Sequence, residues 1–254
     1  MNPFDLGGRV AIVTGGNGGI GLGMAEGLAQ AGATVVIAGR NAQKSAAAVK
    51  ALEAAGGRAS AIEVDVTSEA SCRSMVAQAV ARHGRLDILV NNAGINIRKQ
   101  PQAYTLAEWN TVLATNLTSA FACAQAAYPH LKAAGRGKVI NIGSMMSIFG
   151  ASFTTPYAAS KGGIVQMTRA LACAWAPDHI EVNAILPGWI DTELTRRARV
   201  DVEGLHERVL ARTPAGRWGD PGDFGGIALF LASPASDFVT GTAIPVDGGY
   251  SVQG

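Results

Sequence analysis

Charged side chains are scarce in this sequence, and neither sign dominates. Asp, Glu, Lys and Arg make up 16% of the chain, below the value of about a quarter that is usual for soluble domains. The formal net charge of +2 provides no broad positive surface for nucleic acid or for an anionic membrane. Because 48% of the residues are hydrophobic, disorder is excluded as well. We therefore expect a compact globular protein without a nucleic-acid or membrane partner.

Cysteine is also rare, and the three cysteines, Cys72, Cys123 and Cys173, form no C-x-x-C pair. An odd number of scattered cysteines predicts free thiols and no disulfide framework. The four histidines include no pair spaced i, i+4, so no metal site is expected. The first residues contain no basic stretch followed by an apolar core, which predicts a cytoplasmic protein without a secretory signal.

Two segments, residues 109–131 and 139–160, lack Asp, Glu, Lys and Arg over the length that a membrane helix needs. Polar residues such as Asn116 and Gln125 interrupt the first, and Pro156 interrupts the second. Hydrocarbon does not accommodate such groups cheaply. Both segments are therefore predicted to be buried within the protein.

Short β-branched segments alternate with longer Ala-rich segments along the chain. Consecutive apolar residues, such as V-A-I-V at 10–13, predict strands that are buried on both faces, as in a parallel sheet with helices on each side. No Pro-rich or Ser-rich linker interrupts the series, so residues 1–254 are expected to form one α/β domain, a Rossmann-type, doubly wound, seven-stranded parallel sheet. The predicted strands are residues 10–13, 34–37, 61–66, 86–90, 138–142, 180–186 and 242–246. The predicted helices are residues 20–31, 42–55, 68–83, 109–133, a helix from 156, and 221–232.

A cluster of glycines, T-G-G-N-G-G-I-G at residues 14–21, joins the first predicted strand to the first helix. Glycines there allow a tight turn and bring backbone N–H groups close to a pyrophosphate, and the helix N-terminus favours its negative charge. We therefore predict a dinucleotide site, and the alternative is a turn that binds nothing. The segment fits two spacings, and the residues alone do not choose between them. These are Gly16, Gly18 and Gly21, or Gly15, Gly19 and Gly21.

The second predicted strand is followed by Arg40, at a position where an acidic residue would hold the ribose hydroxyls of NAD. The guanidinium of Arg40 instead matches a 2′-phosphate, so we predict a preference for NADP(H), with NAD(H) as the alternative cofactor. The alternative role for Arg40 is that of a solvated turn residue. Asp65, at the end of the third strand, is predicted either to accept a bond from the adenine amino group or to form a turn.

Pro156 begins a helix on which Tyr157 and Lys161 share one face, four residues apart. A phenol has a pKa of about 10, and a neighbouring cation lowers that value, which produces a usable general acid or base. The alternative is an exposed helix pair without a function. Ser144 follows the fifth predicted strand, at the carboxyl edge of the sheet, where its hydroxyl is able to polarise a substrate carbonyl.

These motifs, together with Asn91-Asn92-Ala93-Gly94 and Pro187-Gly188, resemble the short-chain dehydrogenase/reductase family over nearly the whole chain. The resemblance implies hydride transfer between nicotinamide and a carbonyl carbon. It favours the second glycine spacing and implies a homotetramer formed through the fourth and fifth helices. The implied catalytic residues are Tyr157 as general acid/base, Ser144 orienting the carbonyl, Lys161 binding the nicotinamide ribose and lowering the Tyr157 pKa, and Asn116 holding a water of the proton relay. The cofactor-binding residues are Gly15, Asn17, Gly18, Gly19, Ile20, Gly21, Arg40, Asp65, Val66, Asn92, Ala93, Gly94, Tyr157, Lys161, Pro187, Gly188, Ile190 and Thr192.

Substrate choice in this family depends on residues that follow three of these motifs. Arg98, with Lys99 beside it, is predicted either to pair with a substrate carboxylate or to belong to a solvated loop. Residues 190–217 are predicted to form a mobile, solvated lid, because residues 191–217 contain six arginines and five acids. The candidate substrate residues are Asn96, Arg98, Met145, Phe149, Phe153 and Trp189.

The segments N-N-A-G-I-N-I-R-K and R-T-P-A-G-R-W-G-D-P resemble the sugar-acid branch of the family, the gluconate 5-dehydrogenases and 2-deoxygluconate 3-dehydrogenases. A keto sugar acid is therefore the expected substrate. An apolar wall of Met and Phe at 145–153 would also suit a 3-oxoacyl thioester reductase or a cyclic ketone reductase. A dinucleotide-binding sensor without catalysis is the non-enzymatic alternative, but it would not need the four catalytic residues that are present.

Overall fold

The computed structural model describes residues 2–253, which fold into one parallel sheet covered by helices. The strand order is β3-β2-β1-β4-β5-β6-β7, which confirms the predicted seven-stranded parallel sheet. The strands are β1 (Val10–Thr14), β2 (Thr34–Gly39), β3 (Arg58–Glu63), β4 (Ile88–Asn91), β5 (Gly137–Ile142), β6 (Ile180–Pro187) and β7 (Ala243–Val246). The α-helices are α1 (Gly19–Gln30), α2 (Ala42–Ala54), α3 (Glu69–His83), α4 (Leu106–Leu113), α5 (Ser119–Ala133), α6 (Thr155–Trp175), α7 (Glu193–Asp201), α8 (Leu205–Arg212) and α9 (Gly225–Ala232).

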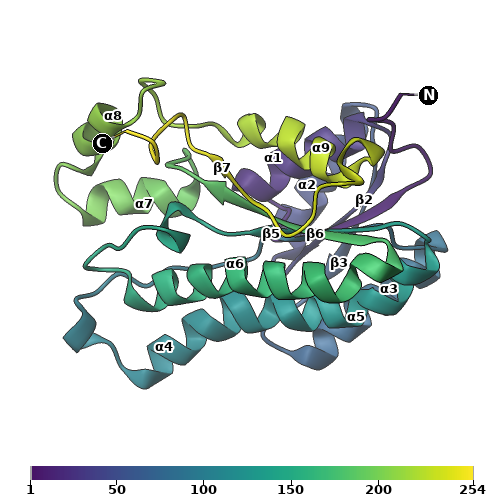
Figure 1. Cartoon of the computed structure of the whole chain (residues 1–254), viewed down its shortest axis with the longest axis horizontal. Helices are drawn as coiled ribbons and strands as arrows, with labels where there is room; N and C mark the ends of the chain where they lie inside the picture. The colour runs from purple at the N-terminus through teal and green to yellow at the C-terminus, as the bar shows by residue number, and fades with distance from the viewer. Residues whose placement is uncertain (1, 254) are drawn as a thin grey trace.

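Helices cover both faces of the sheet (Figure 1). The helices α1, α2 and α9 pack on one face, and α3, α5 and α6 pack on the other. Residues of β1 alternate between the two faces: Ala11 and Val13 contact the first set of helices, and Val10 and Ile12 contact the second. Burial of each large aliphatic side chain contributes about 1.5–3 kcal/mol. Burial on both faces therefore explains the continuous apolar runs that indicated the sheet.

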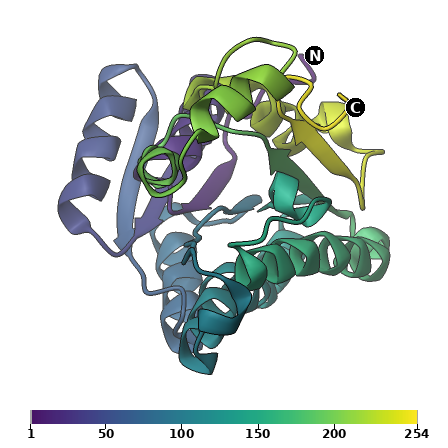
Figure 2. The ribbon, with the colours of Figure 1, turned by 90° about the vertical axis from the view of Figure 1, so that its left-hand side faces the viewer.

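The carboxyl ends of the strands lie along one edge of the sheet. The chain passes from β1 to β2 on one side and later from β3 to β4 on the other side of β1, so the strand order reverses next to β1. Ligands of doubly wound sheets bind at such a switch point. Figure 2 shows this region from the side on which α4, α7 and α8 lie. The loops that follow β1, β4, β5 and β6 meet there.

One long helix was predicted over residues 109–133, and the structure has two helices separated by a π-helical turn, η2 (Ala114–Thr118). The turn is closed by the backbone N–H of Ser119, which donates to the carbonyl of Ala114. The first helix also begins earlier than predicted, because Thr105 and Glu108 form a capping box at its N-terminus. The T-x-x-E pattern of that box was present in the sequence.

The lid segment, residues 190–217, was predicted to be solvated because of its many charges, but it forms helices with apolar contacts of their own. It contains α7 and α8, which share a small apolar cluster. Ala198, Leu205 and Val209 are buried there, with Trp189 and Trp218 packed against them. The predicted solvated loop is thus a pair of amphipathic helices with a core of its own.

The strand β3 lies three residues before the predicted position. Its residues pair in parallel with β2 over the whole range from Thr34↔Arg58 to Gly39↔Glu63. As an edge strand it is only partly buried, so its own sequence is less apolar than that of a central strand. The prediction was therefore shifted toward the apolar residues Val64 and Val66, which follow the strand. No helix within residues 2–253 is long and apolar enough to cross a membrane.

Candidate active site

The glycine-rich turn between β1 and α1 has a conformation that requires glycine at specific positions. Gly15 and Gly19 have φ angles of 62° and 52°, a region that other residues rarely adopt. A Cβ at Gly21 would collide with the side chain of Asn92 and the carbonyl of Gly15. Gly18 has a φ of 176°, and a Cβ there would lie in open space. This geometry favours the spacing Gly15, Gly19 and Gly21.

The N-terminus of α1 offers donors to an anionic ligand. Within the described residues, this 12-residue helix has no side-chain cap and no acidic residue in its first turn. The first N–H groups of a helix have no partner inside the helix, and the helix dipole adds partial positive charge. The glycine cradle and this donor set fit the pyrophosphate of a dinucleotide. Asn17, Gly18 and Ile20 lie at the same turn and are exposed or partly exposed.

Asn92, in the loop after β4, supports the glycine-rich turn. Its Nδ2 donates to the carbonyls of Thr14 and Gly15 at 3.0 and 3.1 Å. The hydroxyl of Thr14 accepts from the backbone N–H groups of Asn92 and Ala93 at 3.0 and 3.2 Å. Asn92 was predicted to bind the cofactor. Its side chain joins the two loops, and exposed Gly94 follows two residues later.

Arg40 is exposed at the end of β2, immediately before α2. Asn41 caps this helix, and its Oδ1 accepts from the backbone N–H of Lys44 at 2.9 Å. Asn17 reaches the same place from the glycine-rich turn, where its Nδ2 donates to the Oγ of Ser45 at 3.0 Å. A cation, a helix N-terminus and an amide thus gather at the position predicted for an adenosine 2′-phosphate.

Asp65 adopts the turn-forming role that was one of its two alternatives. Its Oδ1 accepts from the backbone N–H and the hydroxyl of Thr67, at 3.0 and 2.8 Å. These bonds, and to a smaller extent the charge of Arg40, hold the pKa of Asp65 below its usual value. Val66 follows it and packs against the core on the α3 side of the sheet. The carboxylate of Asp65 therefore stays charged on the same side of the site as Arg40.

Tyr157 and Lys161 lie on the first two turns of α6, which Pro156 helps to begin. The Nζ of Lys161 is 5.7 Å from the centre of the Tyr157 ring. It donates to the carbonyl of Ile142, at the end of β5, at 2.6 Å. Lys161 is 4% exposed, so the predicted pair is not an exposed surface pair.

The acid–base properties of this pair differ from the expectation in one respect. Burial raises the pKa of Tyr157, whereas the Ser144 hydroxyl and then the charge of Arg98 lower it. Burial also lowers the pKa of Lys161 to about 8. We expected Lys161 to lower the pKa of Tyr157, but its ammonium is bonded to Ile142 and desolvation of the phenol is the larger effect. Tyr157 is therefore protonated at neutral pH, as a proton donor must be.

Ser144 is held in position by a serine that the sequence did not single out. The backbone N–H of Ser144 donates to the Oγ of Ser147 at 3.1 Å. The hydroxyl of Ser147 in turn donates to the carbonyl of Lys161 at 2.7 Å. The Oγ of Ser144 accepts from the backbone N–H of Met146 at 3.1 Å, which leaves its own proton to donate. Ser147 thus ties the loop after β5 to the helix that carries the tyrosine.

Asn116 lies within the π-helical turn η2, and its side chain is buried at 2% exposure. Its Oδ1 accepts from the backbone N–H of Ile95 at 2.8 Å, and its Nδ2 donates to the Ile95 carbonyl at 2.9 Å and to Ser160 Oγ at 3.1 Å. A Cβ at Gly94 would lie 3.3 Å from Asn116 Oδ1 and 3.7 Å from Lys161 Nζ. The side chains of Asn116 and Lys161 therefore both approach Gly94 on the side where a Cβ would lie. Local departures from α-helical geometry often occur at functional sites.

The loop after β6 reaches the glycine-rich turn. Pro187 ends the strand, and a Cβ at Gly188 would lie 2.6 Å from Asp247 Cα, so only glycine fits. Ile190 is 3% exposed and packs into the core. Thr192 lies opposite the turn, with its Cγ2 3.2 Å from the position that a Cβ on Gly19 would take. The start of the lid segment thus closes one side of the predicted cofactor groove.

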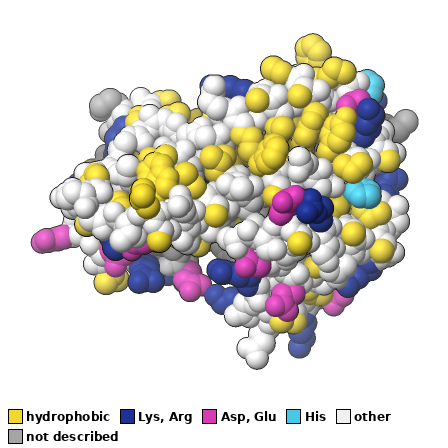
Figure 3. Space-filling view, turned by 90° about the horizontal axis from the view of Figure 1, so that it is seen from below, with side chains coloured by type: hydrophobic (Ala, Val, Ile, Leu, Met, Phe, Trp, Pro, Cys, Tyr) yellow, Lys and Arg dark blue, Asp and Glu magenta, His cyan; other side chains and the backbone are white. Residues whose placement is uncertain are grey.

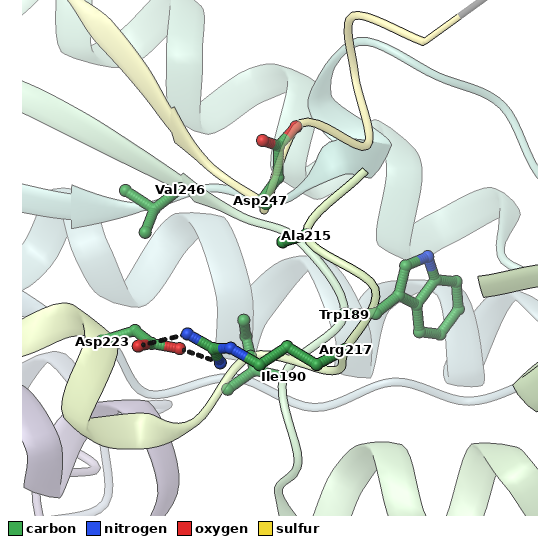
Figure 4. A pocket seen from close by; sticks show the side chains of 9 residues that line it. Trp189, Ile190, Ala215, Arg217, Asp223, Val246 and Asp247 are labelled. Atoms are coloured by element: carbon green, nitrogen blue, oxygen red, sulfur yellow. Dashed lines mark hydrogen bonds and ion pairs between the residues drawn. The ribbon is translucent and has the colours of Figure 1, made fainter. Parts of the chain in front are cut away.

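A cavity of about 210 Å³ lies next to this loop, and Trp189 and Ile190 are among the residues that line it. Figure 4 shows Arg217 and Asp223 forming a bidentate ion pair along one side, with N···O distances of 2.7 and 2.9 Å. None of the four predicted catalytic residues is among its lining residues. We therefore regard the cavity as separate from the catalytic groups.

Arg98 lies beneath the lid segment and is 12% exposed. Its Nη1 is 3.5 Å from Asp201 Oδ2, and its Nη2 donates to the carbonyl of Leu194 at 3.3 Å. Burial lowers the pKa of Arg98, and the neighbouring Asp201 and Tyr157 act in the opposite direction. The guanidinium therefore sits close enough to the tyrosine to act on it electrostatically, and it is not a solvated loop residue.

Lys99 points away from Arg98, so the predicted pair of cations is divided. The ammonium of Lys99 pairs with Glu108 at 2.5 Å, and its backbone N–H donates to the carbonyl of Phe153 at 3.2 Å. The Oδ1 of Asn96 is buried and has no hydrogen-bond partner within the part of the chain that the structure describes. Of the charged candidates, only Arg98 thus lies beside the catalytic groups.

Three of the apolar candidates pack against other side chains of the loops around the site. Met145 is 2% exposed and packs in a small cluster beneath the loop after β5. Phe149 contacts Tyr250 edge to face, with ring centres 6.3 Å apart. Trp189 contacts Trp218 in the same way at 5.7 Å. These side chains hold the loops around the site, and sequence position alone did not distinguish packing from substrate contact.

A glycine-rich turn that fits a pyrophosphate at the switch point, beside a partly buried phenol that stays protonated, is the arrangement of dinucleotide-dependent oxidoreductases with a Rossmann-type fold. Comparison with known proteins supports this classification. A family model described as enoyl-(acyl carrier protein) reductase matches residues 15–251. The chain belongs to the family that this model represents, the short-chain dehydrogenases/reductases.

Several similar proteins are named as dehydrogenases of sugar acids. The 2-dehydro-3-deoxy-D-gluconate 5-dehydrogenase of Escherichia coli (strain K12) is 42% identical over 98% of both chains. The gluconate 5-dehydrogenase of Gluconobacter oxydans (strain 621H) is 40% identical over 98% of this chain and 97% of its own. A crystal structure of a gluconate 5-dehydrogenase from Burkholderia cenocepacia J2315, in complex with NADP and tartrate, superposes with a TM-score of 0.94 at 42% identity. That match covers 100% of this chain and 99% of the other.

Proposed function

We propose that the protein interconverts a keto sugar acid and the corresponding secondary alcohol, with NADP(H) as the preferred cofactor. The observation that carries the proposal is the position of Arg98, a cation that is 12% exposed and is held between the loop after β4 and the lid helix α7. A guanidinium there suits a substrate that bears a carboxylate as well as a carbonyl. The named activities of the similar proteins, and the tartrate dicarboxylate in the Burkholderia structure, support the same substrate class.

The cofactor would be held along the edge formed by the glycine-rich turn, the loop after β4 and the loop after β6. Gly15, Gly19 and the N-terminus of α1 fit the pyrophosphate, and Arg40 fits the 2′-phosphate. The sequence around Arg40, residues 34–46, contains no acid at the end of β2 that would hold the free ribose hydroxyls of NAD, which supports the preference for NADP(H). When bound, the cofactor supplies or accepts the hydride.

Within this chain, Tyr157 holds the proton that a reduced carbonyl oxygen requires. Burial keeps the phenol protonated, and the neighbouring Ser144 hydroxyl is placed to donate to the same oxygen. Lys161, with a pKa of about 8, and Asn116 both lie next to Gly94 and would connect Tyr157 to solvent. In the oxidative direction Tyr157 would take up the proton of the alcohol.

The assay that tests the function follows nicotinamide absorbance with NADPH and with NADH against four kinds of substrate. These are 5-ketogluconate, related keto sugar acids, a 3-oxoacyl thioester and a neutral cyclic ketone. We expect turnover of the keto acids with NADPH. Turnover confined to thioesters or neutral ketones would replace the substrate assignment with one of the two reductase alternatives. Cofactor binding without turnover of any carbonyl would instead favour the sensor.

We further propose that the protein is a cytoplasmic homotetramer, with residues 190–217 acting as its substrate lid. Figure 3 shows hydrophobic side chains spread across one face of the molecule. On α5, Phe121 is 47% exposed, and Phe238, before β7, is fully exposed. Exposed aromatic groups of this kind are typical of subunit interfaces. Three free cysteines suit a reducing compartment. A monomer in light scattering would contradict the tetramer.

A further inference from the structure

Arg98 already has an anionic partner in the protein. Asp201 Oδ2 lies 3.5 Å from Nη1, a long distance for a charge-assisted bond, and Asp201 is 40% exposed. The second contact of Arg98, from Nη2 to the Leu194 carbonyl at 3.3 Å, is long as well. Both contacts are weak compared with a bidentate pair between arginine and a carboxylate.

The two partners of Arg98 lie on one face of a single helix. Leu194 and Asp201 are seven residues apart on α7, or about two helical turns, and the buried Ala198 lies between them. Arg98 lies in the loop after β4, which belongs to the body of the protein. The guanidinium therefore joins the body of the protein to the inner face of the lid.

We propose that Asp201 occupies Arg98 in place of the substrate carboxylate, and that it sets how strongly the enzyme selects anionic substrates. This inference rests on the proposed function, in which Arg98 reads the carboxylate of a keto sugar acid. A substrate carboxylate that engages the guanidinium fork must displace Asp201 or remain close to it. In either case the two negative charges compete for one cation, and the competition lowers the affinity for the anion. A neutral ketone does not enter this competition.

The experiment compares steady-state kinetics of the wild type and Asp201→Asn, with 5-ketogluconate and with a neutral cyclic ketone, at saturating NADPH. Removal of the competing charge should lower KM for 5-ketogluconate about two- to fivefold, the range of a partly exposed ion pair, with kcat little changed. KM for the neutral ketone should stay the same. Titration of 5-ketogluconate into the NADP⁺-saturated protein by calorimetry should show the same gain in affinity without turnover.

Glu203→Gln is the matched control, because Glu203 is an exposed acid of the same lid segment and its substitution removes the same charge. It should leave KM for both substrates unchanged. If Glu203→Gln lowers KM for the keto acid as much as Asp201→Asn does, the effect is general electrostatics and the inference is wrong. Asp201→Ser, which also removes the carboxylate, guards against an effect peculiar to asparagine.

A third variant separates the inference from the proposed function. Arg98→Gln should lower kcat/KM for 5-ketogluconate about 10- to 100-fold more than for the neutral ketone, which loses only the effect of the Arg98 charge on Tyr157. An equal loss for both substrates would refute the carboxylate-reading role and with it the proposed function. A selective loss in Arg98→Gln, combined with an unchanged or raised keto-acid KM in Asp201→Asn, would overturn the role of Asp201 alone.

Discussion

Substitution of Asn116 by alanine should reduce both the stability and the activity of the protein. The side chain makes bonds of 2.8 and 2.9 Å with the backbone N–H and carbonyl of Ile95, and it is 2% exposed. Each buried backbone group left without a partner costs about 1–3 kcal/mol, so for the two groups of Ile95 we expect a loss of about 2–6 kcal/mol. For a domain of this size, that loss corresponds to a fall in Tm of about 5–20 °C.

The matched control is Asn183→Ala in the middle of β6. Asn183 is 1% exposed, its Nδ2 donates to the Val239 carbonyl at 2.7 Å, and its Oδ1 accepts from the Thr242 N–H at 3.2 Å. Both variants should lose similar thermal stability in calorimetry. Only Asn116→Ala should also lose turnover, by about 10²-fold, because it displaces the loop that carries Gly94 next to Lys161. A Tm close to that of the wild type for Asn116→Ala, or equal losses of turnover in both variants, would refute this reasoning.

Three further predictions concern the chemistry. Tyr157→Phe should retain NADPH binding, measured by fluorescence titration, but lose about 10²–10⁴-fold in kcat, because only the proton donor is removed; near-normal turnover would contradict its role. Arg40→Ala should raise the Kd for NADPH about 10- to 100-fold and leave that for NADH nearly unchanged, whereas an equal effect on both would make Arg40 a turn residue. Because burial lowers the pKa of Lys161 to about 8, its charge is lost as pH rises through that value, so kcat/KM for reduction should fall above about pH 8. A profile flat to pH 9.5 would show that this charge is not needed.

The sequence predicted the sheet well because its strands are buried on both faces. Segments such as V-A-I-V have no exposed positions that would interrupt the apolar run. The number of strands and their parallel arrangement could therefore be predicted from the sequence. The edge strand β3 was misplaced, since an edge strand buries only some of its residues. The helices of the lid segment were missed because the prediction rested on its charged composition, although Leu205 and Val209, four residues apart, have the spacing of a buried helical face.

The candidate site was predicted as a set of positions, but its interactions were not. Motif spacing placed Tyr157, Lys161 and Ser144 at one edge of the sheet. It gave no information about the contact between Arg98 and the lid, because Asp201 is about a hundred residues away in sequence. The direction of the Tyr157 pKa shift also required the structure, since it depends on burial, which a sequence motif does not specify.

The π-helical turn η2 determines how α4 is rotated about the helix axis relative to α5. Successive residues of an α-helix advance by about 100°, so one additional residue in a turn rotates everything beyond it by that angle. Deletion of one residue within Ala114–Thr118 would restore a regular helix and turn the N-terminal half, including Trp109, to a different face relative to α5. Surface loops generally tolerate changes in length. The number of residues in Ala114–Thr118 cannot change without rotating α4 relative to α5. An insertion or deletion here would disrupt packing even if every contact residue were retained.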